Sequence, residues 1–293
     1  MRTITVSLAL QQLLLTLQTA SACLVSVEST QGSAPRESGA WMAVTQGSGT
    51  LIGTIGGGHL EMEAITLARN LLLAPAADVE LPLVRRWSLG PSLGQCCGGA
   101  VSLRFEIVHA EHAKTLSRRL QPALHDLALF GGGHVGHALV RALAPLPFAV
   151  QWIDSRDSIF PVDVPPQVQC EHSDPVEAAV LDLPPGSRVL IMSFSHAEDL
   201  SIVATCLKRQ REQGDLPFVG LIGSATKRAV FGSRLRQRGF SEEELAHITC
   251  PIGIAGITGK EPEVIAASVA AQLLQSVYRE ADSAVKFSDK GMS

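Results

Sequence analysis

The stretch LALFGGGHVGHAL, residues 127–139, decides the fold of this chain. Gly131, Gly133 and Gly136 have the spacing of the G-x-G-x-x-G fingerprint, and they stand directly between an apolar strand and a helix. In that arrangement the first glycine makes a tight turn, the second lets a phosphate approach the backbone, and the third lets the helix pack on the strand. The stretch therefore predicts a dinucleotide-binding fold, although the same glycines could serve packing alone.

Regular alternation of strands and helices surrounds this stretch, and such alternation predicts a doubly wound parallel sheet with helices on both faces. Asp154 ends the second strand of the series, where an acidic side chain can bind ribose hydroxyls, while Arg156 beside it could instead meet a phosphate. The expected strands are residues 127–133, 148–154, 188–195 and 217–224, and the expected helices are residues 134–143, 197–211, 226–238 and 261–279, with another helix after Pro175.

The chain before residue 124 has a different pattern. Short strands are expected at residues 23–30, 40–45 and 100–110, with a helix at residues 59–73. The first residues imitate a signal peptide, but glutamines interrupt the apolar run, and the leucine spacing favours an amphipathic first helix. We therefore divide the chain into an N-terminal mixed α/β domain (residues 1–124), a Rossmann-like domain (residues 125–281) and a disordered tail (residues 282–293).

The composition excludes several classes of partner. The 293 residues are 46% hydrophobic with 26 glycines and only 4% aromatic residues, which is typical of α/β proteins. The net charge of −4 gives no general attraction to nucleic acid or to an anionic membrane. Six cysteines are scattered through the chain without a disulfide framework, so we expect a reducing compartment, the cytoplasm.

A second glycine-rich loop, ending in GGGHLE, leads into the predicted helix at residues 59–73. Gly57 and Gly58 would present backbone N–H groups to an anion at the helix N-terminus. Glu61 stands where a third fingerprint glycine would be, so this is not a second dinucleotide site. His59 could be a ligand, and Glu61 could simply favour the helix dipole.

Two neighbouring cysteines, Cys96 and Cys97, precede a glycine pair in SLGQCCGG. A structural zinc site would need further ligands at short spacing, and a disulfide between neighbours would be strained. Two interpretations stay open. The pair could be buried and structural, or it could be reactive, because the flanking glycines expose N–H groups that would lower a thiol pKa. A reactive pair could attack an electrophile, carry a persulfide or bind a soft metal.

Polar side chains follow two further strands of the Rossmann-like domain. Ser193, Ser195, His196 and Asp199 lie in MSFSHAEDL, at the carboxyl end of a strand where open α/β sheets bind ligands. In GLIGSATKR, Gly223 and Ser224 open a helix and Lys227 lies in its first turn. A cation there opposes the helix dipole, which favours an anionic ligand.

Seven motifs carry a resemblance over almost the whole chain: GSAPRESGAWMAV, GTIGGGHLE, LGQCCGG, LFGGGHVG, SHAEDL, GLIGSATKR and PIGIAGITGKEP. With them the chain resembles the xanthine dehydrogenase accessory protein family of the XdhC/CoxI type, and is similar to its xanthine dehydrogenase branch. The carbon monoxide dehydrogenase branch usually has a single cysteine, at the position of Cys97, and a cysteine in place of His59. This chain has Phe194 where the family often has histidine, which weakens the case for a metal site there.

The resemblance implies a non-catalytic maturation chaperone. It would bind molybdenum cofactor (molybdopterin), support its sulfuration with a cysteine desulfurase and deliver it to apo-xanthine dehydrogenase. Because this pterin dithiolene carries a phosphate, we expect its phosphate on the Rossmann-like loops and a soft donor near the metal. The implied cofactor-binding residues are Gly57, Gly58, His59, Glu61, Gly131, Gly133, Gly136, Asp154, His196, Gly223, Ser224 and Lys227; Cys96 and Cys97 would handle sulfur, with Cys97 the candidate molybdenum contact.

Two other functions stay open at this point. An NAD(P)-dependent oxidoreductase would use the fingerprint glycines and Asp154 for its nucleotide, and a nucleotide could also occupy the Rossmann-like crevice of an accessory protein. A protein-only scaffold would join the desulfurase to the dehydrogenase without a cofactor. We expect the chain to form a homodimer.

Overall fold

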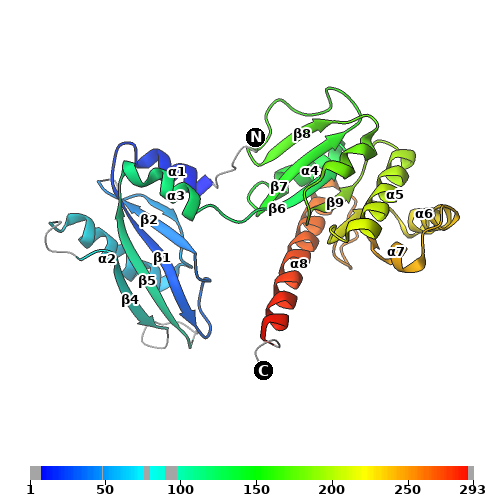
Figure 1. The fold of residues 1–293 in the computed structure, drawn as a ribbon. Helices are drawn as coiled ribbons and strands as arrows, with labels where there is room; N and C mark the ends of the chain where they lie inside the picture. The colour runs from blue at the N-terminus through cyan, green and yellow to red at the C-terminus, as the bar shows by residue number, and fades with distance from the viewer. Residues whose placement is uncertain (1–7, 48, 76–79, 90–97, 290–293) are drawn as a thin grey trace. The chain divides into compact units, whose positions relative to one another are not determined.

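The structure is a computed structural model that describes residues 8–47, 49–75, 80–89 and 98–289, with side chains of the last helix described to residue 278. The chain divides after Pro122 into two compact units, an N-terminal unit and a C-terminal unit (Figure 1). None of the described helices combines the length and the apolar composition needed to cross a membrane.

The N-terminal unit is built on a five-stranded sheet in the order β3-β2-β1-β5-β4, and every pair of neighbours is antiparallel. Helix α2 packs on one face, while α1 and α3 pack on the other. The strands are β1 (Ala22–Gln31), β2 (Trp41–Thr45), β3 (Leu51–Gly53), β4 (Leu83–Ser88) and β5 (Ala100–Val108); the helices are α1 (Leu8–Thr16), α2 (Gly58–Leu73), α3 (Ala113–Arg119) and the 3-10 helix η3 (Ala110–His112).

Alternation along β1 explains why helices cover both faces of this sheet. Cys23 and Val25 point into the core beneath α2, whereas Ala22 and Leu24 point into the core beneath α1. Successive side chains of a strand point to opposite faces, so a strand that is apolar at successive positions requires cover on both. The predicted helix at residues 59–73 and the amphipathic first helix are confirmed. The strands β3 and β4 were not predicted.

The C-terminal unit is built on a six-stranded sheet in the order β11-β10-β9-β6-β7-β8, and all neighbouring strands are parallel. Counted from its own first strand, β6, this is the strand order of dinucleotide-binding folds, so the Rossmann-like prediction is confirmed. The strands are β6 (His125–Phe130), β7 (Phe148–Asp154), β8 (Val168–His172), β9 (Arg188–Ile191), β10 (Phe218–Leu221) and β11 (Ile248–Thr249).

Helices cover both faces of the parallel sheet, with α4 and α8 on one face and η4, α5, α6 and α7 on the other. The helix expected after Pro175 is present as a 3-10 helix. The last helix continues to Asp289, past Asp282, where the sequence led us to expect a disordered tail. The helices are α4 (His134–Leu143), η4 (Val176–Asp182), α5 (His196–Gln213), α6 (Ala225–Gln237), α7 (Glu242–Ala246) and α8 (Pro262–Asp289).

Candidate functional site

Three of the sequence motifs and Asp154 meet at the carboxyl ends of the parallel strands in the C-terminal unit. The glycine loop follows β6, Asp154 ends β7, the SHAEDL motif opens α5 after β9, and Ser224 caps α6 after β10. The strand order reverses between β6 and β9, and open α/β sheets bind ligands in the crevice outside such a switch point. The fold therefore brings these predicted residues to one edge of the sheet.

The glycine loop after β6 has the steric properties that the fingerprint predicts. A Cβ atom at Gly131 (φ 123°) would lie 2.0 Å from the carbonyl oxygen of Met192, and one at Gly136 would lie 2.2 Å from the carbonyl oxygen of Gly131. Trp152 Nε1 donates to that same Gly131 oxygen at 2.9 Å. Gly133 caps α4 and has no atom within 4 Å of its Cβ position. The loop is thus closed at its first and third glycines and open at the second, where a phosphate would approach.

Asp154 is saturated with hydrogen bonds inside the protein. Its side chain is 2% exposed and accepts from the N–H of Gly132 at 2.6 Å and from the N–H of Arg156 at 2.9 Å. The guanidinium of Arg156 adds Nε to Oδ1 at 2.9 Å and Nη2 to Oδ2 at 2.8 Å. Burial would raise the pKa of Asp154, but these donors together hold it below its usual value.

The saturation of Asp154 changes its predicted role. A carboxylate has about four lone-pair directions, and the donors from Gly132 and Arg156 fill them. In this arrangement Asp154 fixes the glycine loop and Arg156, and a ribose hydroxyl would have to displace one of these donors to bind it. Ribose binding by Asp154 stays a prediction.

Lys227 lies in a buried ion pair rather than facing an open anion site. Its Nζ is 2.5 Å from Asp199 Oδ2, and it donates to the carbonyl oxygen of Ile222 at 2.8 Å. Asp199 Oδ1 accepts from both the N–H (2.8 Å) and the Oγ (2.7 Å) of Ser193. Gly223 leaves room for the Lys227 stem, because a Cβ there would lie 2.6 Å from Lys227 Cδ. The pair ties α5 to α6, and its positive charge is already neutralised.

The two helix starts at this edge are capped by serine side chains. Ser195 Oγ accepts from the N–H of Glu198 at 3.2 Å, and Ser224 Oγ accepts from the N–H of Lys227 at 3.3 Å. His196, the first residue of α5, is exposed, and its ring stands edge-on to Phe231 with centroids 6.3 Å apart. His196 is therefore free to meet a ligand at the edge of the sheet.

In the N-terminal unit, Glu61 occupies the loop that was expected to cradle an anion. Its Oε2 accepts from Thr54 Oγ1 at 2.5 Å and from the N–H groups of Ile55 and Gly57 at 3.0 Å each. Burial would raise the pKa of Glu61, but these donors hold it below its usual value. Gly57 (φ 75°) and Gly58 (φ 68°) adopt the left-handed conformation that lets the loop fold back. The chain supplies its own carboxylate to these N–H groups.

His59 belongs to a chain of polar contacts that was not predicted from the sequence. Its Nε2 lies 3.2 Å from Glu63 Oε1, and Glu63 Oε2 accepts from Trp87 Nε1 at 2.7 Å. The indole of Trp87 is 8% exposed, so it anchors Glu63 from the core. Glu63 in turn orients the half-exposed imidazole. The four-residue spacing of His59 and Glu63 on a helix is the signal that could have shown this pair.

Cys96 and Cys97 lie outside the described residues. The chain on either side of them is described, and the N–H of Leu89 donates to the carbonyl oxygen of Gly99 at 2.7 Å. A Cβ at Gly99 would lie 2.4 Å from the carbonyl oxygens of Gln31 and Ser33, so Gly99 packs tightly on the loop after β1. That loop also touches Gly56, whose Cβ position is 2.5 Å from Pro35 Cβ. Gly99, the loop after β1 and Gly56 therefore meet at one end of the antiparallel sheet.

The four cysteines within the described residues are shielded from solvent to different degrees. Cys23, Cys206 and Cys250 are buried, and Cys170 is partly buried. Burial raises the pKa of Cys23 and of Cys206 to about 12, so both are protonated thiols at neutral pH. Among the described residues, no group of three or more His, Cys, Asp and Glu side chains could hold a metal ion.

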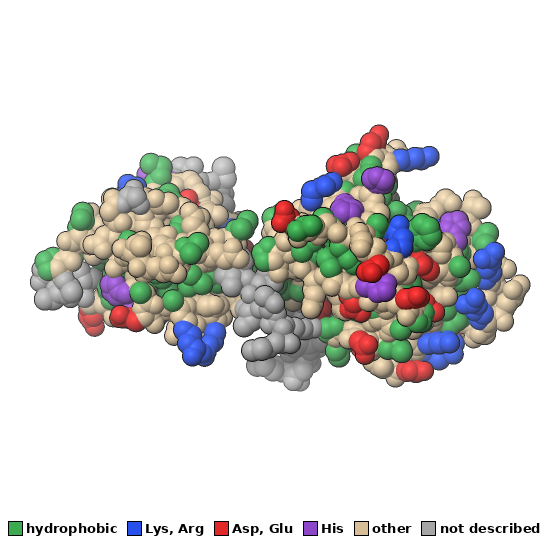
Figure 2. Space-filling view, turned by 90° about the horizontal axis from the view of Figure 1, so that it is seen from above, with side chains coloured by type: hydrophobic (Ala, Val, Ile, Leu, Met, Phe, Trp, Pro, Cys, Tyr) green, Lys and Arg blue, Asp and Glu red, His purple; other side chains and the backbone are tan. Residues whose placement is uncertain are grey.

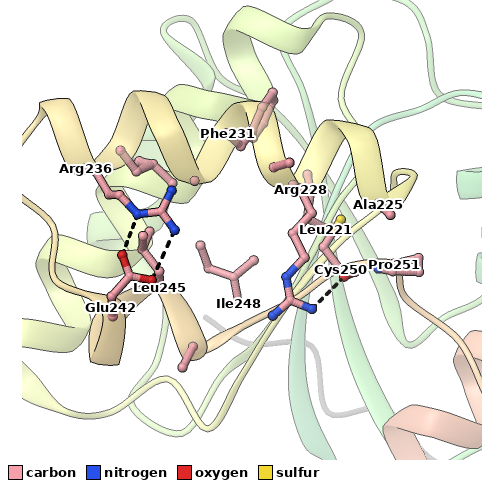
Figure 3. A pocket seen from close by; sticks show the side chains of 14 residues that line it. Leu221, Ala225, Arg228, Phe231, Arg236, Glu242, Leu245, Ile248, Cys250 and Pro251 are labelled. Carbon is pink, nitrogen blue, oxygen red and sulfur yellow. Dashed lines mark hydrogen bonds and ion pairs between the residues drawn. The ribbon is translucent and has the colours of Figure 1, made fainter.

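A separate cavity of about 420 Å³ lies between α6, α7 and β11 (Figure 3). Phe231, Leu245 and Ile248 give it apolar walls, while Arg228 reaches the carbonyl oxygen of Cys250 at 3.1 Å on one side. None of the predicted site residues that the structure describes lines it. On the face drawn in Figure 2, acidic, basic and histidine side chains are interspersed over the C-terminal unit, in keeping with the absence of a strong net charge.

Comparisons with known proteins agree with the two units. A family model described as the XdhC Rossmann domain matches residues 127–273, and one described as the XdhC and CoxI family matches residues 16–80. The chain is 30% identical over 255 residues to the uncharacterized protein YqeB of Escherichia coli (strain K12), an alignment that covers 86% of this chain and 43% of that protein. The chain thus spans less than half the length of this curated relative.

A solved structure shares the fold. A crystal structure described as a xanthine dehydrogenase from Bacillus halodurans matches with a TM-score of 0.72, over 92% of this chain and 96% of that chain. The two sequences are 21% identical, so the match bears on the fold alone.

Proposed function

The chain belongs to the XdhC and CoxI family, and we propose that it serves xanthine dehydrogenase maturation by binding molybdenum cofactor, supporting its sulfuration with a cysteine desulfurase and delivering it to the apoenzyme. The observation that carries the proposal is the placement of the family motifs. Three lie with Asp154 at the carboxyl edge of the parallel sheet, and two lie with Gly99 at one end of the antiparallel sheet. Loops gathered in this way are where such folds bind ligands.

The described residues fit the phosphate end of the cofactor. Gly133 leaves open space at the start of α4, where backbone N–H groups and the helix dipole favour an anion. Arg156 lies beside this loop and uses only part of its guanidinium to hold Asp154. The molybdenum cofactor, when bound, would supply the molybdenum and dithiolene chemistry that the target enzyme requires.

A carrier role also suits the way the charged groups are used. Asp154, Glu61 and Lys227 all make short contacts within the protein, so they hold loops in place rather than stand ready to transfer protons. Such pre-organised loops lower the entropy cost of binding a ligand. The thiol part of the proposal rests on Cys97, which would contact sulfur or molybdenum, with Cys96 as its neighbour.

A transfer assay tests the proposal. The purified chain is loaded with cofactor in the presence of a cysteine desulfurase and cysteine, and is then mixed with apo-xanthine dehydrogenase. Xanthine oxidation should recover faster and further than with free cofactor, and Cys97→Ala should abolish the advantage. Cys170→Ala removes a partly buried thiol outside the motifs and should behave as wild type. Equal recovery with and without the chain would contradict the proposal. Partner binding without cofactor would instead indicate a scaffold.

A further inference from the structure

Arg156 and Phe194 form a stacked pair at the switch point of the parallel sheet. Arg156 follows β7 and Phe194 follows β9, and β6 lies between these two strands in the sheet. The guanidinium carbon of Arg156 is 4.7 Å from the centroid of the Phe194 ring, within the range of a cation–π contact. The fold thus joins two side chains that are far apart in the sequence, beside the glycine loop that ends β6.

The guanidinium of Arg156 is held in a fixed plane. Its Nε and Nη2 donate to the two carboxylate oxygens of Asp154, which is itself anchored by the N–H of Gly132. The neighbouring Ser155 is fixed as well, since its Oγ donates to Glu198 Oε1 at 2.7 Å and its carbonyl oxygen lies 3.0 Å from His172 Nε2. A pre-organised arginine loses little freedom when it binds a ligand.

The opposite edge of the same guanidinium remains available. Both pairings with Asp154 use Nε and Nη2, and Nη1 has no hydrogen bond to any described residue. The Arg156 side chain is 34% exposed, so part of it is open to solvent. Phosphate and carboxylate groups are the natural partners of an arginine edge.

Phe194 and Glu198 both have contact capacity that the described residues do not use. Phe194 is 66% exposed although one face of its ring lies on Arg156, so aromatic surface remains for a second planar group. Glu198 Oε2 is buried and accepts no hydrogen bond from the described residues, which leaves a costly acceptor unsatisfied. A ring N–H or an amino group is the kind of donor it lacks.

We propose that Arg156 and Phe194 bind a planar nitrogen heterocycle that carries a phosphate. The ring stacks on Phe194, and the phosphate accepts hydrogen bonds from the Nη1 edge of Arg156. A phosphorylated pterin and a purine nucleotide share this chemistry. A pterin ligand would deepen the proposed function and would rest on it, but the site needs neither molybdenum nor a cysteine.

Calorimetric titration of the full chain with two molybdenum-free probes tests the site. One probe is neopterin monophosphate and the other is adenosine 2′-phosphate, with the unphosphorylated neopterin and adenosine as comparisons. Saturable binding of either phosphorylated probe is expected, and the probe that binds identifies the source. Loss of the phosphate should weaken binding about 10-fold or more, because the charge-assisted contact with Arg156 is lost.

Variants assign the binding to the stacked pair. Phe194→Leu keeps an apolar side chain but removes the ring face, and it should weaken binding about 10-fold. Arg156→Lys keeps the positive charge but replaces the planar guanidinium and its several N–H donors with a single ammonium group, so it should weaken binding of the phosphorylated probes. Arg211→Ala is the matched control, because Arg211 also stacks on a phenylalanine (5.1 Å from the Phe240 ring) and pairs with a carboxylate, at the other end of α5. It should bind as wild type.

Two results would overturn the inference. One is that neither phosphorylated probe binds the wild-type chain, and the other is that Phe194→Leu and Arg156→Lys bind as tightly as Arg211→Ala. These outcomes are separable from failure of the proposed function, which is measured by the transfer assay and depends on Cys97. The inference can therefore fail while cofactor delivery stands, and delivery can fail while a nucleotide binds the pair.

Discussion

The buried ion pair between Asp199 and Lys227 allows a quantitative test of how the carboxyl edge of the parallel sheet is held. Lys227→Met removes the ammonium group and keeps most of the aliphatic stem, so it acts on charge more than on packing. The side chains of Lys227 and Asp199 are 11% and 3% exposed, so the carboxylate left behind is shielded from water. Removing one partner of such a pair costs about 3–5 kcal/mol. Because Ser193 still donates two hydrogen bonds to the remaining carboxylate of Asp199, we expect the loss in the free energy of unfolding at the lower end, about 3 kcal/mol.

Differential scanning calorimetry measures this loss. A destabilisation of about 3 kcal/mol lowers the Tm of a domain of this size by roughly 6–12 °C. Arg236→Met is the matched control on the same helix, because Arg236 pairs with Glu242 with both side chains more than half exposed, and it should leave Tm almost unchanged. Adding Asp199→Asn to Lys227→Met should recover part of the loss, since no charge then stays buried. Equal shifts for Lys227→Met and Arg236→Met would refute the reasoning.

Three further predictions concern the glycine loops and the thiols. Gly136→Ala places a methyl group 2.2 Å from a backbone carbonyl oxygen and should lower the free energy of unfolding in urea by about 1–3 kcal/mol, whereas Gly133→Ala meets no atom within 4 Å and should stay close to wild type. The pKa of Glu61 in the folded protein is lowered from 4.5, so ionised Glu61 stabilises the fold above pH 4.5, and this stabilisation is lost as the pH falls through the folded pKa. Acid unfolding followed by circular dichroism should therefore show a smaller loss of stability between neutral and acidic pH in Glu61→Gln than in wild type. Because burial raises the pKa of Cys23 and Cys206 to about 12, a disulfide reagent at about pH 8 should label neither before unfolding, and labelling of either in the native protein would contradict their burial.

The sequence predicted the parts of the fold in which local chemistry and tertiary structure agree. Gly131 and Gly136 stand where backbone carbonyl oxygens leave no room for a Cβ atom. Their spacing therefore predicted β6, the tight turn and α4 correctly. The regular alternation after residue 125 also predicted the parallel sheet correctly. By contrast β8 lies at a sheet edge after a proline-rich stretch, and only its first residue, Val168, is buried, so it carried little strand signal.

The sequence predicted which residues reach the carboxyl edge of the parallel sheet, but not how their side chains pair there. Lys227 was expected to face an anionic ligand, yet it pairs with Asp199, which is 28 residues earlier in the chain. Trp87 holds Glu63 across 24 residues, and no local pattern indicates this contact. Periodicity and motifs report on which edge of a sheet a residue reaches, while the partner of a charged group depends on which helices are brought together there.

The most direct measurement is the molybdenum and pterin content per chain after anaerobic purification from cells that make the cofactor, with wild type, Cys97→Ala and Cys170→Ala treated side by side. Our account predicts nearly one molybdenum and one pterin per chain for wild type and for Cys170→Ala, and a loss of both for Cys97→Ala. Wild-type protein that contains neither molybdenum nor pterin under these conditions would contradict the claim that this chain carries the cofactor.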